Sequence, residues 1–186
     1  MKLGLVIYGD LEQISGGYLY DRKLVDYLQK NGDNVEVISI PRSNYLENVS
    51  DNFDYKLYER LRNLDVDILL EDELNHPSLF YLNRKLDGEI DYPKVSIVHH
   101  LSSRSTRHKN EREMYRYFEK KYLETLDGFI FNSKSTRDDV ISLVDEVNGV
   151  VAYPGKDHVS PGKPAFSTPE QDLEILFVGN LVPHKG

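Results

Sequence analysis

The 186-residue sequence contains neither cysteine nor tryptophan. Without cysteine the chain forms no disulfide bond and no thiolate metal site, which is compatible with a reducing compartment. No apolar run approaches the ~20 residues that a membrane-spanning helix needs. The apolar stretch after Met1 and Lys2 is also too short for a secretory signal peptide. We therefore expect a cytoplasmic protein whose membrane association is at most peripheral.

Positive charge is also scarce, since 23 lysine and arginine residues stand against 31 aspartate and glutamate residues, for a net charge of -8. This balance argues against nucleic acid as a partner, because proteins bind the phosphate backbone mainly through cations. One local basic patch is a candidate site for an anionic acceptor or a lipid headgroup, but interleaved glutamates favour an ordinary solvated face. The patch consists of Arg104, Arg107, His108, Lys109, Arg112 and Arg116.

What the sequence does contain is a regular alternation of strand-like and helix-like segments. Short apolar runs predict buried strands at 3–8, 35–40, 66–70, 94–99, 129–131, 149–153 and 173–178. Helices are expected at about 17–30, 53–64, 77–86, 110–126 and from Ser133 or Ser135 to about 147, with polar loops at 42–51 and 101–110. The order predicts an α/β fold, a Rossmann-like doubly wound parallel sheet with helices on both faces.

The composition changes after residue 153, where Pro154, Pro161, Pro164 and Pro169 fall close together. Such a cluster is typical of a linker. We expect an N-terminal domain over 1–160, an interdomain linker over 161–172, and the first strand and turn of a second domain over 173–186. Because a strand after a linker cannot complete a sheet alone, we expect the chain to be the front part of a longer two-domain protein.

Two adjacent histidines, His99 and His100, follow the apolar run 95–98. Ligands of open parallel sheets bind beyond the carboxyl ends of the strands, so this is a candidate active-site edge. Neighbouring residues on a strand point to opposite faces, and only one of the two histidines is expected to face a cleft. A metal site would need a further ligand such as His108, and the tract has no HExxH pattern, so we expect no metal here.

Polar side chains also follow two other predicted strands. Gly16 and Gly17 precede the first helix, where glycine lets backbone amides approach a phosphate, although the motif is not GxGxxG and a tight turn is the simpler interpretation. The run 71–73, followed by Asn75, either contacts sugar hydroxyls or a cation, or is a solvated acidic turn before the next helix. Both interpretations remain open, with Glu73 and Asn75 the preferred ligand contacts.

Six segments, taken in order, resemble the front half of retaining GT-B-fold glycosyltransferases of the group often labelled glycosyl transferases group 1 (family 4-like). The glycine pair looks like the family's glycine loop, and the strand 96–100 resembles the one that ends in the active-site histidine, which makes His99 the match. The other segments are 30–37, 127–136, 151–157 and 175–186. The fold implied is the N-terminal half of a GT-B fold.

The resemblance implies transfer of a sugar, with retention, from a nucleotide-diphosphate sugar to a carbohydrate or lipid-linked acceptor, with no cofactor and no obligatory metal. His99 would act in the reacting region, and the missing second domain would bind most of the donor. The donor diphosphate would lie near Gly16, Gly17 and Lys185. The acceptor would lie near Glu73, Asn75, His100 and Arg104. The chain departs from the family at Asn180, where an arginine often pairs with the diphosphate.

Two other functions fit the same architecture. A sugar-nucleotide epimerase needs no acceptor, so analysis of products without acceptor separates it from a transferase. A non-catalytic binding module would need no second α/β domain downstream. A flavodoxin-like domain is disfavoured, because no recognisable phosphate loop follows the first strand directly.

Overall fold

A computed structural model gives the structure of residues 1–105 and 108–155. The chain divides into two units, Met1–Tyr153 and Pro154–Gly186, of which the first is described below. The predicted linker, the strand 173–178, Asn180 and Lys185 lie outside the described residues, and the predicted domain boundaries stay predictions. In the described part of the chain, no helix has the length and apolar character needed to cross a bilayer.

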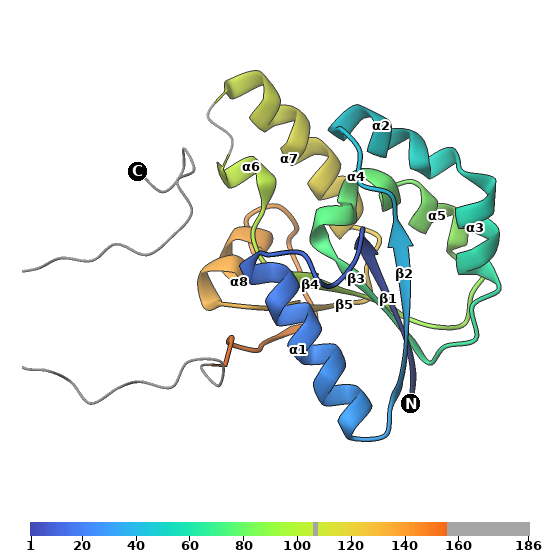
Figure 1. Cartoon of the computed structure of the whole chain (residues 1–186). Coiled ribbons are helices and arrows are strands. Elements are labelled where there is room, and N and C mark those ends of the chain that lie inside the picture. The colour runs from blue at the N-terminus through green and yellow to red at the C-terminus, as the bar shows by residue number, and fades with distance from the viewer. Residues whose placement is uncertain (106–107, 156–186) are drawn as a thin grey trace, which may run out of the picture. The chain divides into compact units, whose positions relative to one another are not determined.

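The first unit is built on six parallel strands in the order β2-β1-β3-β4-β5-β6 (Figure 1). Every neighbouring pair is parallel, as expected when a helical crossover joins successive strands. The predicted α/β, Rossmann-like fold is therefore confirmed. The strands are β1 (Lys2–Tyr8), β2 (Asn34–Ile40), β3 (Ile68–Asp72), β4 (Lys94–Val98), β5 (Gly128–Phe131) and β6 (Gly149–Val151).

One face of the sheet is covered by α1 (Gly16–Lys30). The helix begins at Ser15, whose hydroxyl accepts a hydrogen bond from the Tyr18 backbone N–H, and it ends before Gly32, which has a φ of 88°. Tyr18 and Val25 are buried against Leu5 and other apolar side chains of the strands. This packing fixes the first turn of α1 close to the carboxyl ends of the strands.

The opposite face of the sheet is covered by five other helices of the described unit, which pack against it through apolar side chains. Their buried side chains form a second apolar cluster with alternate residues of the same strands, such as Val6 and Phe131. Helices on both faces were predicted, and they are present. These helices are α3 (Tyr55–Arg62), α4 (His76–Leu79), α5 (Leu82–Leu86), α7 (Lys109–Leu123) and α8 (Lys134–Ile141).

Several predicted boundaries were wrong, most of them where helices are short. The expected loop 42–51 contains α2 (Tyr45–Ser50), capped by Asn44, and runs into the 3₁₀ helix η1 (Asp51–Phe53). The expected loop 101–110 contains α6 (Ser102–Ser105), and the single helix expected at 77–86 is two helices. Ser133 rather than Ser135 caps α8, which ends at Ile141. Helices of one or two turns lack the apolar periodicity on which the prediction rests.

Gly149, in the edge strand β6, provides a stability test of the sheet. A Cβ atom at this position would lie 2.7 Å from the carbonyl oxygen of Phe129 and 2.8 Å from the ring of Phe131. Gly149→Ala is therefore expected to lower the free energy of unfolding by about 1–3 kcal/mol, measured by urea denaturation. Gly16→Ala is the matched control, since its Cβ would meet nothing within 4 Å. An unchanged midpoint for Gly149→Ala would contradict the packing described.

Candidate active site

Side chains alternate between the two faces of the sheet along β3 and β4, and this determines which face each polar residue at the carboxyl ends of these strands lies on. Leu70 and Ile97 pack in the cluster on the α1 face, so Asp72 and His99, two residues further along each strand, fall on that face too. Glu71 belongs to the opposite face, where its Oε2 accepts a hydrogen bond from Asn83 Nδ2 at 3.1 Å. The sheet thus aims one histidine and one carboxylate at α1.

Asp21 of α1 meets this histidine. Its Oδ1 lies 2.9 Å from His99 Nε2, and its side chain has no exposed surface. We did not predict this residue from the sequence, although a signal is present: Asp21 lies at helical spacing between the buried residues Tyr18 and Val25. A carboxylate on the apolar stripe of a helix needs a buried partner, and His99 supplies it.

The glycine turn also adjoins His99. A Cβ at Gly17 would lie 3.1 Å from His99 Cδ2, whereas a Cβ at Gly16 would point into open space. Tyr20 borders the imidazole on another side, with its ring edge-on at a centroid distance of 5.2 Å. Gly17 is therefore needed for close approach of α1 to the imidazole, and the start of this helix and the end of β4 form one site.

Hydrogen bonds to the His99 backbone fix the end of β4. The backbone N–H donates to Glu73 Oε2 at 2.8 Å, and the carbonyl oxygen accepts from Asn132 Nδ2 at 2.9 Å. Thr136 Oγ1, in the first turn of α8, lies 3.5 Å from the same carbonyl. Groups following β3 and β5 therefore hold the His99 backbone on both sides, which fixes the point from which its side chain projects.

The electrostatics of this cluster depend on burial and on the number of acids. Burial alone would lower the pKa of His99, but Asp21 outweighs it and, with Glu73 and Asp72, raises that pKa to about 9. Burial, and then the charge of Asp21, raises the pKa of Asp72 to about 7. Burial and the charge of Asp72 also hold the pKa of Glu73 well above its usual range. At neutral pH the site therefore favours an imidazolium and a protonated Glu73, while Asp72 is close to the midpoint of its titration.

The acidic run 71–73 is buried, so its interpretation as a solvated turn was wrong. Glu71 and Asp72 are the last residues of β3, which was expected to end at Leu70, and Glu73 opens the 3₁₀ helix η2 (Glu73–Asn75). Burial raises the pKa of Glu71 to about 7. A run of three carboxylates resembles a surface loop in sequence, because its partners come from distant segments.

Asp21, Asp72 and His99 also form a group of residues able to hold a metal ion, with one donor atom from each within 4.8 Å of the others. Oxygen and imidazole donors suit several divalent cations. In the structure, however, the Nε2 atom of His99 is already hydrogen-bonded to Asp21. A proton shared between neighbouring carboxyl groups would also relieve the negative charge here without any ion.

The predicted acceptor contacts are not all brought together. Asn75 is fully buried, and its amide donates to the carbonyl oxygens of Val6 and Asp72, which ties β1 to β3. His100 is exposed, and Arg104 pairs with Asp139 at 2.9 Å. Contact of these residues with an acceptor stays a prediction, but Glu73 lies directly in the His99 site.

Comparison with known families adds to this geometry. The family model described as Glycosyltransferase Family 4 matches residues 19–158, which is most of the chain. The chain belongs to this family. The matched segment of the family 4 chain includes Asp21, Asp72 and His99, while β1 and Gly17 precede it. A comparison with curated proteins gave no match.

Proposed function

We propose that the described domain is the acceptor-side domain of a retaining glycosyltransferase, which transfers a sugar from a nucleotide-diphosphate donor to an acceptor. The observation that carries this proposal is the contact of His99 with Gly17 at the start of α1. It brings an imidazolium beside the first backbone N–H groups of a 15-residue helix. Both are positive features, and both suit a reaction whose leaving group is a diphosphate.

The chemistry follows from where charge develops. When the bond between the sugar and the diphosphate breaks, negative charge grows on the departing oxygens. The N-terminus of α1 would stabilise that charge, and Lys185, from the predicted second domain, would add an ammonium group. His99, whose side chain is 11% exposed, would contact the donor sugar through the part of its ring that is exposed. Asp21 is a positioning residue, because it orients the ring and keeps it protonated.

The test uses the full-length protein with a panel of nucleotide-diphosphate sugars and carbohydrate acceptors. We expect release of nucleoside diphosphate that depends on acceptor, and a product whose anomeric configuration matches the donor. An inverted product would overturn retention. Conversion of the sugar nucleotide without any acceptor would favour an epimerase. We also expect residues 1–186 alone to be inactive, since most of the donor site would be missing.

We further propose that transfer needs no metal ion. Asp21 and His99 contact each other directly, and shared protons can relieve the charge of their carboxyl neighbours. We expect EDTA, at roughly 10-fold excess over enzyme and so enough to remove a weakly held ion, to leave the rate of sugar transfer within about twofold. Added Mg²⁺ or Mn²⁺ should likewise leave this rate within about twofold. Loss of activity with EDTA, restored by one of these cations, would instead assign Asp21, Asp72 and His99 as metal ligands.

A further inference from the structure

A cavity lined by Leu74 and His76 lies close to the His99 site, just beyond Glu73. Its volume is about 300 Å³, and residues of α2, α4, α6 and α7 line it together with residues at the ends of β1 and β2. The lining is polar and aromatic. The residues that matter for its chemistry are Tyr8, Arg42, Tyr45, His76, Ser105 and Tyr115.

Two hydrogen bonds connect this cavity to the active-site histidine. His76 Nδ1 lies 3.0 Å from the Glu73 carbonyl oxygen, and Glu73 Oε2 accepts from the His99 backbone N–H at 2.8 Å. Since Nδ1–H donates to the carbonyl, Nε2 is left to accept from the Tyr45 hydroxyl, at 3.1 Å. Burial lowers the pKa of His76 to about 4, so this wall of the cavity is neutral.

The aromatic part of the lining is held in place before any ligand arrives. The rings of Tyr45 and Tyr115 meet edge-on, with centroids 4.5 Å apart, and both side chains are half-buried. Their rings offer apolar surface next to hydroxyl groups, a combination suited to a molecule that has both C–H faces and hydroxyls. A sugar ring has this character.

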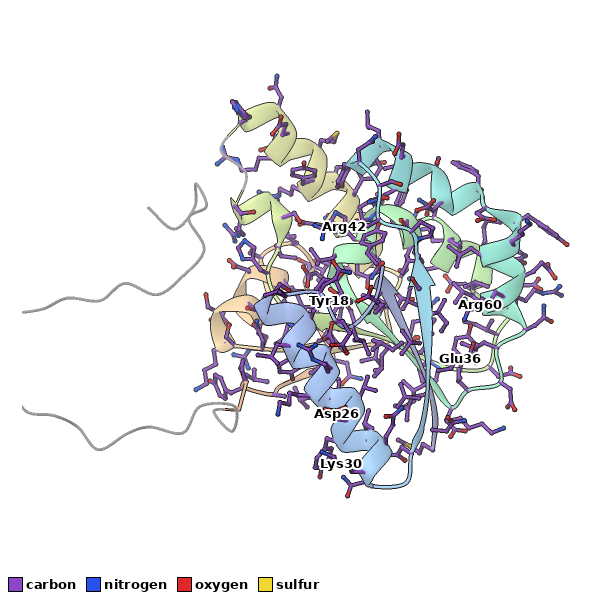
Figure 2. All side chains as sticks on the ribbon, in the orientation of Figure 1. Tyr18, Asp26, Lys30, Glu36, Arg42 and Arg60 are labelled. Atoms are coloured by element: carbon purple, nitrogen blue, oxygen red, sulfur yellow. The ribbon has the colours of Figure 1, made fainter. Side chains whose placement is uncertain are left out.

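Arg42 supplies the cavity with a positive charge. Most described arginines lie in ion pairs, but Arg42 has no carboxylate of the described residues within ion-pair distance, in a protein of net charge -8. Its Nη1 donates to Gln13 Oε1 at 3.2 Å, and Gln13 Nε2 donates to the Tyr8 carbonyl at 2.6 Å. The guanidinium is thus held just beyond β2, near Tyr18 (Figure 2). Most of its N–H donors have no partner among the described residues.

We propose that this cavity binds the acceptor of the glycosyltransferase, and that the bound part is a sugar carrying an anionic group, a carboxylate or a phosphate, which pairs with Arg42. The inference rests on the proposed function and names the acceptor class for that site. A guanidinium binds either anion through two parallel hydrogen bonds. Glu73 connects the lining residue His76 to the backbone of His99, so the cavity adjoins the segment that carries the proposed reacting group.

The experiment measures binding of small sugars to the full-length protein without donor, by NMR at low ionic strength. The probes are glucuronate, glucose 6-phosphate, glucose and inorganic phosphate. We expect one or both anionic sugars to bind roughly 10- to 100-fold more tightly than glucose, and which one binds identifies the anion. Arg42→Gln is expected to abolish this preference.

Arg60→Gln is the matched control, because Arg60 is paired with Glu36 beside β2, away from Arg42 (Figure 2). It should leave binding unchanged. Equal binding of glucose and the anionic sugars, no binding of any sugar, or a preference that survives Arg42→Gln would overturn the proposal. Inorganic phosphate binding as tightly as the anionic sugars would reduce the cavity to an anion site and overturn it as well. The binding experiment involves neither donor nor turnover, so a negative result does not test the transfer reaction. Conversely, binding of these sugars can be measured even if no transfer is detected.

Discussion

His99→Ala is expected to reduce the rate of sugar transfer by the full-length protein roughly 100- to 1,000-fold, because a preorganised charge at the reacting sugar would be lost. The effect should fall mainly on kcat, since we propose that a second domain supplies most of the donor affinity. The measurement is the initial rate of nucleoside diphosphate release at saturating donor. Wild-type turnover in this variant would remove His99 from the site.

The controls separate chemistry from folding. Alanine at position 99 leaves Asp21 buried without its partner, which is itself destabilising. His99→Gln retains an N–H group that can donate to Asp21 but carries no charge, so it should fold normally and still be slow. His108→Ala replaces an exposed histidine at the start of α7 and is expected to leave both rate and stability unchanged.

The free energy of unfolding is expected to fall as the pH rises from 5 to 9, in contrast to proteins stabilised by ionised acids. The pKa of His99 is raised from 6.5 to about 9, so its stabilising contribution is fully present below pH 6.5 and is lost as the pH rises through 9. A shift of this size corresponds to roughly 3 kcal/mol. The pKa of Asp72 is raised from 3.8 to about 7, so the native state prefers its neutral form and loses stability over that range. Both effects have the same sign.

Urea denaturation at a series of pH values tests this expectation, with Asp21→Asn as the comparison. The substitution removes the main group that raises the pKa of His99, so the decline between pH 7 and 9 should become much shallower. Glu71 lies on the other face of the sheet and keeps its raised pKa in both proteins. The free energy of unfolding should therefore still fall with rising pH below pH 7 in both. If the free energy of unfolding fell equally steeply with pH above pH 7 in the two proteins, the Asp21–His99 pair would not contribute as described.

The sequence allowed the sheet to be predicted because its evidence is local. Apolar runs mark strands within a few residues, and the alternation along β4 is enough to separate His99 from His100. The acids of the site could not be placed in the same way. Asp21 and His99 are 78 positions apart, and Asp72 resembles a loop residue until its buried neighbours are known. Arg42 was overlooked because its significance lies in the absence of a partner, which only distances reveal.

Among the described α-helices, α1 is the one that packs in the core cluster on its face of the sheet (Figure 1). It also carries Gly17 and Asp21. The smaller of the two core clusters and the proposed site of chemistry thus depend on one helix. A fluctuation that lifts this helix exposes Leu5 and its neighbours to water and, at the same moment, takes the carboxylate away from the imidazole. Mutations that loosen α1 to admit new substrates would therefore weaken the scaffold as well.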